Sequence, residues 1–298
     1  MSTPWKPSLP VSEALVRSLI AEQCPGLDPM ALRYVGAGWD HAVWRCGDTV
    51  LRLPHQADST ELACRHVTAL RALGKHLPIP IPVPTIVGRP TDEYPATFVG
   101  YRWLDGLTTE RRQLTVEDRA RNAEPLAHVL RILHALPCET GRSWGLELVD
   151  NGSMQLRADY GALRAKQLRH GPYASLARLA ADAMHPPPPQ CPSSDYRVVH
   201  GDLHSGQVLF DEAHNISGII DWDELGIGDP AFDLLMVWSF LPPSARGAFW
   251  DLYGDFPGHA RARHVALSYG LAILAQAAES SLTALAAEAA FSLENTLA

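Results

Sequence analysis

The sequence predicts an α+β protein in which a small, β-rich N-terminal part precedes a larger, mostly helical C-terminal part. Short strand-like runs interrupted by glycine occur before residue 105, whereas apolar residues at helical spacing fill most of the chain after it. The chain has 298 residues and a hydrophobic content of 46%, enough for two lobes that share an interface. Segregated helices and strands are typical of α+β folds.

The N-terminal elements follow from apolar spacing and turn residues. A helix is expected over residues 11–24, with Ser12 as its cap. Short strands are expected at residues 34–35, 42–44 and 50–53. Gly47 and Asp48 stand between the last two, where a hairpin turn is needed.

The rest of the N-terminal part contains one helix, one proline-rich segment and one strand. Apolar spacing predicts a helix over about residues 60–73. The run PIPIPVP, residues 78–84, excludes a helix or a central strand and predicts an extended surface segment. A strand is expected over residues 98–104, closed by Asp105 and Gly106.

The C-terminal part is predicted to be helical outside one central region. Helices are expected over residues 116–136, 156–184 and 261–297, the last as one or two helices. Prolines make residues 185–194 a loop. The boundary between the two parts is placed at residue 104, which gives domains 1–104 and 105–298.

Composition excludes several classes of protein. A net charge of −8 disfavours nucleic acid as a partner and suits a cationic small molecule, although many cytosolic proteins are mildly acidic for solubility alone. The five cysteines form no C-x-x-C pair, so neither a disulfide framework nor a zinc site is supported. The polar N-terminus and the lack of a long apolar run predict a cytoplasmic protein without a signal peptide or membrane span.

The most informative stretch begins VVHGDLHSGQVLF and continues as GIIDWDELGIGDPAFDL. Asp202 and Asp221 stand nineteen positions apart, each after an apolar, strand-like run, and Gln207 follows Asp202 by five positions. Protein kinases use a loop of the form H-R-D-L-x-x-x-N, followed by a second aspartate that holds magnesium. This pattern indicates phosphoryl transfer from a nucleotide.

The chemistry assigns a role to each of these three residues. Phosphoryl transfer needs the attacking hydroxyl, the γ-phosphate and the metal held in line. Asp202 can orient the hydroxyl and accept its proton. Asp221 and Gln207 offer the hard oxygen ligands that Mg²⁺ prefers.

Other polar residues of this stretch have more than one interpretation. His200 and His204 are either a metal pair or structural residues that shape the loop, and the structural role is favoured because they lie in a loop. Asp229 and Asp233 are read as a helix cap and a buried loop anchor, outside the chemistry. The acidic pair at residues 223–224 either meets metal or substrate, or is simply solvated.

Binding a nucleotide requires a loop that closes over its phosphates and a positively charged side chain that contacts them. Gly36 and Gly38 lie between two predicted strands and could approach phosphates closely, although an ordinary hairpin turn would look the same. Arg52, on the next strand, is either a surface residue or the phosphate ligand, and the ligand role is favoured. Glu61 is the candidate acid that orients Arg52 from the following helix.

Together these motifs resemble the aminoglycoside phosphotransferase family, which shares the bilobal protein-kinase-like fold with choline kinases and macrolide phosphotransferases. The resemblance rests on GAGWDHAVWRCGDTVLRLP, LPIPIPVPTIVG, YRWLDG and the central stretch. It implies that Asp202 is the catalytic aspartate and Asp221 a metal ligand. Gln207 departs from the usual asparagine, and Arg52 stands where lysine is usual.

The resemblance also implies that the two parts of the chain have different functions. Residues 1–104 would be a nucleotide-binding lobe that ends in a hinge, with Arg102, Trp103 and Leu104 binding the purine base through their backbone. Residues 105–298 would be a helical lobe that carries the catalytic loop and the substrate site.

The leading functional hypothesis is a kinase that uses ATP or GTP with Mg²⁺ to phosphorylate a hydroxyl of an aminoglycoside-type antibiotic. One alternative keeps the chemistry and changes the acceptor to a macrolide, an amino alcohol or a sugar. Five aromatic residues could line a macrolide pocket or belong to the core: Trp238, Phe240, Phe249, Trp250 and Tyr253. The other alternative is a nucleotide-binding pseudokinase.

Overall fold

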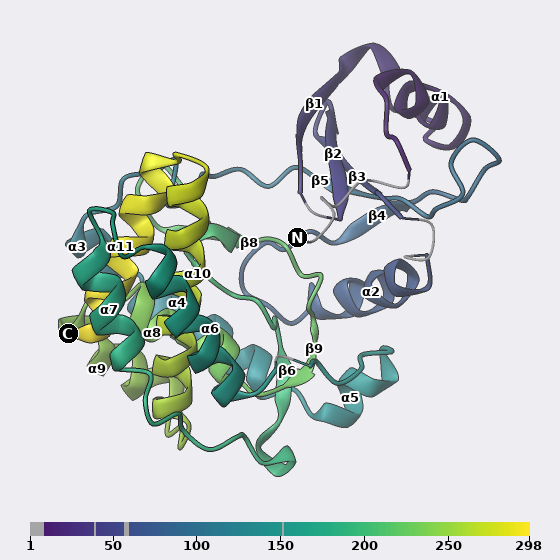
Figure 1. Ribbon diagram of the computed structural model, residues 1–298. Helices are drawn as coiled ribbons and strands as arrows, with labels where there is room; N and C mark the ends of the chain where they lie inside the picture. The colour runs from purple at the N-terminus through teal and green to yellow at the C-terminus, as the bar shows by residue number, and fades with distance from the viewer. Residues whose placement is uncertain (1–8, 39, 57–59, 151) are drawn as a thin grey trace. The chain divides into compact units, whose positions relative to one another are not determined.

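The structure of the chain is a computed structural model (Figure 1) that describes residues 9–38, 40–56, 60–150 and 152–298, with the backbone alone for residues 60–65. The chain forms two compact units. The first comprises Met1–Lys75 and Ile81–Leu104, and the second His76–Pro80 and Asp105–Ala298. The mixed α+β class predicted from the sequence is confirmed, with the antiparallel sheet in the first unit and the long helices in the second.

The first unit is built on a five-stranded antiparallel sheet of order β1-β2-β3-β5-β4. Its strands are β1 (Leu32–Ala37), β2 (His41–Cys46), β3 (Thr49–Pro54), β4 (Pro84–Val87) and β5 (Val99–Arg102). Two helices complete it, α1 (Glu13–Gln23) and α2 (Thr60–Leu73). As predicted, Ser12 caps α1, accepting a hydrogen bond from the N–H of Leu15, and Gly47 adopts a φ of +58° in the β2–β3 turn.

The prediction of an extended surface segment over residues 78–84 is only partly right. Pro78 and Pro80 are exposed, whereas Ile81 is only 5% exposed and Pro82 and Pro84 are buried. Proline removes a backbone donor but keeps an apolar ring that packs well. Pro84 begins the edge strand β4, a place where the missing N–H costs no ladder hydrogen bond.

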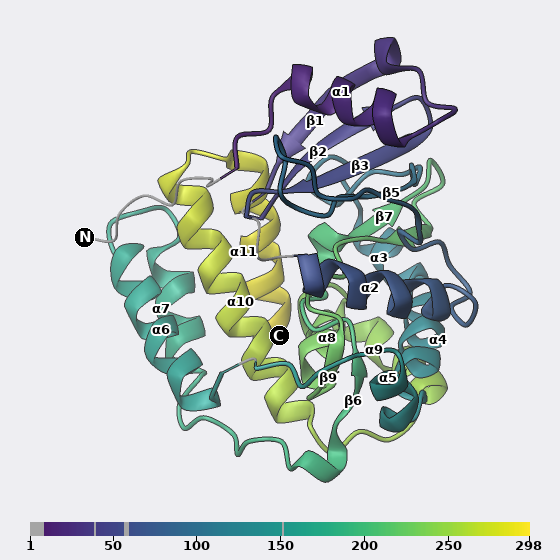
Figure 2. The same cartoon turned by 90° about the vertical axis from the view of Figure 1, so that its right-hand side faces the viewer.

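The second unit contains nine of the helices described in the structure (Figure 2). They are α3 (Val116–Arg121), α4 (Ala123–His134), α5 (Cys138–Ser143), α6 (Met154–Gln167), α7 (Ala174–Asp182), α8 (Ala231–Ser239), α9 (Pro243–Tyr253), α10 (His259–Glu279) and α11 (Thr283–Leu297). The long helix α10 packs against α6, α8 and α11. Its buried face includes Leu267, Leu271 and Leu274, which centre the apolar core of this unit.

Four short strands form two antiparallel pairs in the second unit. Strand β6 (Arg197–Val199) pairs with β9 (Gly226–Gly228), and β7 (Val208–Phe210) pairs with β8 (Ile216–Ile219). These pairs carry the central motif of the sequence.

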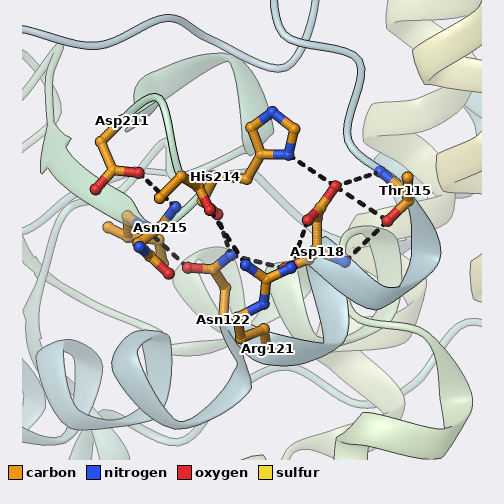
Figure 3. A network of polar contacts seen from close by, with 9 residues as sticks. Thr115, Asp118, Arg121, Asn122, Asp211, His214 and Asn215 are labelled. Atoms are coloured by element: carbon orange, nitrogen blue, oxygen red, sulfur yellow. Dashed lines mark hydrogen bonds and ion pairs between the residues drawn. The ribbon is translucent and has the colours of Figure 1, made fainter.

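The helix predicted over residues 116–136 is divided into α3 and α4 at Asn122. The Asn122 amide donates to the carbonyl oxygens of Asp118 and His214 and accepts from the N–H of Ile216. Asp118 accepts from the His214 ring at 2.8 Å and also completes a capping box with Thr115. This network, drawn in Figure 3, fastens α3 to the β7–β8 hairpin.

In the part of the chain that the structure describes, no helix combines the length and the apolar character needed to cross a membrane.

Candidate active site

The β7–β8 hairpin brings Gln207 and Asp221 together. Val208 pairs with Ile219, and the N–H of Ile220 donates to the Gln207 carbonyl at 2.9 Å, which extends the pairing by one step. Both side chains therefore emerge at the same end of the hairpin. The Gln207 Nε2 donates to the Asp221 Oδ2 at 3.1 Å.

The loop that carries Asp202 runs between β6 and the short helix Ser205–Gln207, and a buried carboxylate fixes it. Asp233, fully buried in α8, accepts from the N–H groups of His200 and Gly201 at 2.8 and 2.9 Å. His134 donates to the same carboxylate at 2.9 Å. The prediction that Asp233 is a loop anchor is confirmed.

The backbone of the site includes two residues in the left-handed region. Gly201 has a φ of +89°, and a Cβ there would lie 2.3 Å from the carbonyl oxygen of Glu224, so only glycine fits. Asp221 has a φ of +63°, which is uncommon for a residue with a side chain. Such conformations concentrate at functional sites, where the surroundings hold them in place.

The two histidines of the loop have the structural roles favoured above. His200 is fully buried, its Nε2 lies 3.0 Å from the Ile220 carbonyl, and its ring packs on Trp222. The His204 Nδ1 accepts from the N–H of Gly206 at 3.1 Å and so caps the short helix. Burial lowers the pKa of His204 to about 3, so its ring is neutral at physiological pH.

The carboxyl group of Asp202 has a strongly raised pKa. Burial is the main cause and raises its pKa to about 7, and the negative charges of Asp221 and Glu224 act in the same direction. The Arg157 guanidinium opposes this shift. A carboxyl group that titrates near neutrality can both hold and accept a proton.

Two neighbours of Asp202 were not found from the sequence. Arg157 comes from α6, where nothing in the helical spacing distinguishes it from a surface arginine. Tyr269 comes from α10 and its ring packs on His204 at 4.6 Å. Burial is the main cause of the raised pKa of its hydroxyl, and the charges of Asp202, Glu110 and Asp221 act in the same direction. Both lie far from the motif in the sequence and become its neighbours only through helix packing.

Of the acidic residues that follow the motif, Asp229 has a structural role and Glu224 influences the site. Asp229 caps α8 by accepting from the N–H of Ala231, as predicted, and it also pairs with Arg261 at 2.8 Å. Glu224 is exposed and acts on Asp202 through its charge, as stated above.

A cation at the Asp221–Gln207 pair would have few protein ligands. Among the residues described, no cluster of three or more His, Cys, Asp and Glu side chains could hold a metal ion. Asp221 and the Gln207 amide supply hard oxygen atoms, which fit Mg²⁺ because it keeps several waters and takes further oxygens from phosphate.

The first unit contains the residues predicted to bind the nucleotide. Arg52 lies in the middle of β3, and one of its terminal nitrogens lies 3.3 Å from the His41 Nδ1. Gly36 pairs with Val43 just after an irregularity in β1, and the N–H of Gly38 donates to the His41 carbonyl. Neither glycine adopts a positive φ, and a Cβ at either would meet no described atom within 4 Å.

The remaining predicted nucleotide residues are placed only in part. Glu61 lies in α2, but its side chain is outside the described residues. Arg102 ends β5 opposite Thr49, and the N–H of Trp103 donates to the Asp48 carbonyl at 2.7 Å. Leu104, half-buried, is the last residue of the first unit.

Comparison with known proteins decides the family. Residues 31–265 match the model of the phosphotransferase enzyme family. The chain belongs to this family. The membership and the phosphotransferase class predicted from the motifs are therefore confirmed.

Solved structures of phosphotransferases share the fold. The GDP complex of wild-type aminoglycoside 2'-phosphotransferase-IIIa is 19% identical, with a TM-score of 0.65 over 96% of this chain and 99% of that one. The apoenzyme of macrolide 2'-phosphotransferase MphH from Brachybacterium faecium is 22% identical, with a TM-score of 0.61 over 95% and 98%.

A curated relative matches over a short segment. Viomycin phosphotransferase from Streptomyces vinaceus is 51% identical over 43 residues, which is 13% of this phosphotransferase and 15% of that protein. The match thus spans well under a fifth of the length of this relative.

Proposed function

We propose that this phosphotransferase transfers the γ-phosphoryl group of ATP or GTP to a hydroxyl group of a small-molecule acceptor. The observation that carries the proposal is the setting of Asp202. Its carboxyl group is perturbed toward neutrality, lies near Asp221, and stands on a loop whose backbone is fixed by Asp233. Perturbed carboxyl groups on rigid loops are typical of catalytic sites.

Asp202 would orient the acceptor hydroxyl and take its proton as the phosphoryl group is transferred. With a pKa of about 7, about half of Asp202 is ionised at neutral pH and able to accept that proton. Asp221 and Gln207 would hold Mg²⁺, which when bound would neutralise negative charge on the phosphates. The Gln207 amide nitrogen donates to Asp221 at 3.1 Å, so Mg²⁺ binding would require the amide to turn its oxygen toward the ion.

The first unit would bind the nucleotide. Arg52 would contact the phosphates, with Glu61 as its orienting acid, and the open space beside Gly36 and Gly38 would let their backbone approach the phosphates. The segment 102–104 would bind the base. Because the N–H of Trp103 is committed to Asp48, other backbone groups of this segment would have to meet the base.

The identity of the acceptor molecule rests on fewer observations than the phosphoryl-transfer reaction does. An aminoglycoside-type antibiotic remains the prediction from sequence, and viomycin and macrolides belong in the same screen because relatives carry their names. A macrolide pocket gains no support from the aromatic residues considered above. Phe240 and Phe249 are fully buried, and Trp250 and Tyr253 pack on Phe249.

The decisive test compares the wild-type protein with Asp202→Asn in an assay of Mg²⁺-dependent nucleotide turnover over a panel of hydroxylated acceptors. We expect Asp202→Asn to lower kcat by about a thousandfold or more while nucleotide affinity changes little. Asp251→Asn, an exposed change on α9, is the matched control. If wild type and Asp202→Asn were equally inactive on every acceptor while both bound nucleotide, the pseudokinase alternative would replace this proposal.

A further inference from the structure

The C-terminal helix α11 reaches the loop that carries Asp202 through one buried ion pair. Arg119 of α3 donates from its two terminal nitrogens to the two carboxylate oxygens of Glu288 of α11, at 3.0 and 2.6 Å. The side chains of Arg119 and Glu288 are only 4% and 14% exposed. A buried pair of this kind fixes both side chains, since separating them would leave an uncompensated charge in the interior.

The same carboxylate holds the beginning of the short helix Ser205–Gln207. The Ser205 hydroxyl donates to the Glu288 Oε1 at 3.2 Å. Ser205 is the first residue of this helix and Gln207 the last, and the N–H of Gln207 donates to the His204 carbonyl at 2.9 Å. A single helical turn has few hydrogen bonds of its own, so a side-chain contact at its first residue strongly affects where its last residue lies.

The guanidinium group of Arg119 is held between two aromatic rings. It lies 4.0 Å from the ring centre of Phe291 on α11 and 5.2 Å from that of Phe240 at the C-terminal end of α8. A stacked guanidinium group that binds a carboxylate through two nitrogens has one preferred orientation. Glu288 is therefore presented to Ser205 at a defined place.

Arg119 is also tied to the hairpin that follows Gln207. It stands on α3 between Asp118 and Asn122, whose side chains bind the β7–β8 hairpin (Figure 3). Gln207 is thus fixed on both sides. Before it, the chain is held by Glu288 and Arg119; after it, the chain enters a hairpin that is fastened to the same helix, α3.

An alternative role for Glu288 is to bind the ammonium group of an acceptor. Glu288 lines a cavity together with Glu110, but the volume of this cavity is about 40 Å³. That is room for a few water molecules and not for a sugar ring. The charge of Glu288 is, moreover, already balanced by Arg119. Both observations favour a role in holding the loop over a role in binding a ligand.

We propose that Glu288 and Arg119 are positioning residues for phosphoryl transfer, which act through Ser205 to hold Gln207 beside Asp221. This inference rests on the proposed function, because it takes Gln207 as a ligand of Mg²⁺. It gives the C-terminal helix α11, which carries none of the sequence motifs, a part in building the site.

The first test titrates Mg²⁺ in the transfer assay, with ATP and the acceptor of the panel above that gives the highest rate. We expect Ser205→Ala and Glu288→Gln to raise the Mg²⁺ concentration for half-maximal rate about three- to tenfold, while the KM of the acceptor stays within about twofold. Ser205→Thr, which keeps the hydroxyl group, should behave like the wild-type protein.

Two variants of α11 serve as matched controls. Ser292→Ala removes a hydroxyl group that lines the same cavity as Ser205, and Glu294→Gln neutralises an exposed acid on the same helix as Glu288. Both should keep the wild-type Mg²⁺ dependence. An unchanged Mg²⁺ dependence in Ser205→Ala would overturn the proposal, and so would a raised acceptor KM as the only effect of Glu288→Gln. If Glu288→Gln does not fold, the serine variants decide.

The second test needs no activity and is made on the protein without nucleotide. Hydrogen–deuterium exchange reports how firmly the N–H of Gln207 is held by the His204 carbonyl. We expect this exchange to be at least about threefold faster in Ser205→Ala than in Ser292→Ala. If no acceptor is phosphorylated, the proposed function fails, and this measurement alone judges the hold on the loop. Equal exchange in the two variants would show that Glu288 does not position it.

Discussion

Asp233 accepts a hydrogen bond of 2.9 Å from the N–H of Gly201, although the two residues stand in different elements far apart in the sequence. Its other oxygen accepts from the N–H of His200 and from the His134 ring. Tyr253 extends this network, since its hydroxyl lies 2.8 Å from the second nitrogen of His134. One buried carboxylate thus fixes the backbone on the N-terminal side of Asp202.

Replacing Asp233 by Asn should therefore destabilise the protein and reduce turnover together. An amide has one oxygen in place of two, so a buried N–H donor loses its acceptor, at a cost of about 2–3 kcal/mol in the free energy of unfolding. Urea unfolding measures this change, and Asp251→Asn should stay within about 0.5 kcal/mol of wild type. Wild-type stability in Asp233→Asn would mean that the loop has another anchor.

Gly201→Ala should impair the loop for a steric reason. The new Cβ would lie 2.3 Å from the Glu224 carbonyl oxygen and would also have to adopt a φ of +89°. Backbone on both sides must shift, so kcat should fall at least about tenfold, together with a loss of stability. The matched control is Gly247→Ala in α9, where a Cβ meets no described atom within 4 Å and the helix should gain up to about 1 kcal/mol. Equal kcat in Gly201→Ala and Gly247→Ala would contradict the steric argument.

The sequence predicted those parts of the site that are local in the chain. The loop around Asp202, the amide at Gln207 and the aspartate at Asp221 can be read from one stretch, because a β-hairpin brings its own ends together. Even the anchoring role of Asp233 was predictable from its place in an apolar helix. Arg157 and Tyr269 were not, because their nearness to Asp202 depends on how α6 and α10 pack.

The fold was likewise predicted correctly only where local sequence determines it. Apolar spacing predicted one helix over residues 116–136, since the pattern runs through Asn122 without interruption. The break arises from hydrogen bonds of Asn122 to the β7–β8 hairpin, which local spacing cannot reveal. The strand β9 was also missed, because Gly-Ile-Gly has low strand propensity and is extended only through pairing with β6.

The Asp118 network predicts a specific acid sensitivity. Hydrogen bonds from Thr115, and then from His214, lower the pKa of the Asp118 carboxyl to about 2 in the folded protein, below its ordinary value of 3.8. A carboxyl group with a depressed folded-state pKa stabilises the fold above its unfolded-state pKa, and this contribution is lost as the pH falls from about 4 to about 2. Asp118→Asn should be less stable at pH 6 and should lose less additional stability over that window. Urea unfolding at several pH values measures the free energy of unfolding of the wild-type protein and of Asp118→Asn. If this free energy varied with pH in the same way in both proteins, the linkage would be disproved.

Gln207→Asn tests the position where the sequence has glutamine in place of the asparagine of the kinase-like motif. We expect the variant to keep Mg²⁺-dependent activity within about threefold, because asparagine retains the amide oxygen and is the usual residue of the motif. Its shorter arm should place the amide oxygen farther from Asp221 and so raise the Mg²⁺ concentration needed for half-maximal rate. Gln207→Leu, which removes the amide but keeps the bulk, should lose most of the Mg²⁺-dependent activity. Magnesium titrations of kcat at saturating nucleotide compare the three proteins. Complete loss of activity in Gln207→Asn would show that the longer arm is required, and wild-type behaviour of Gln207→Leu would exclude this residue as a metal ligand.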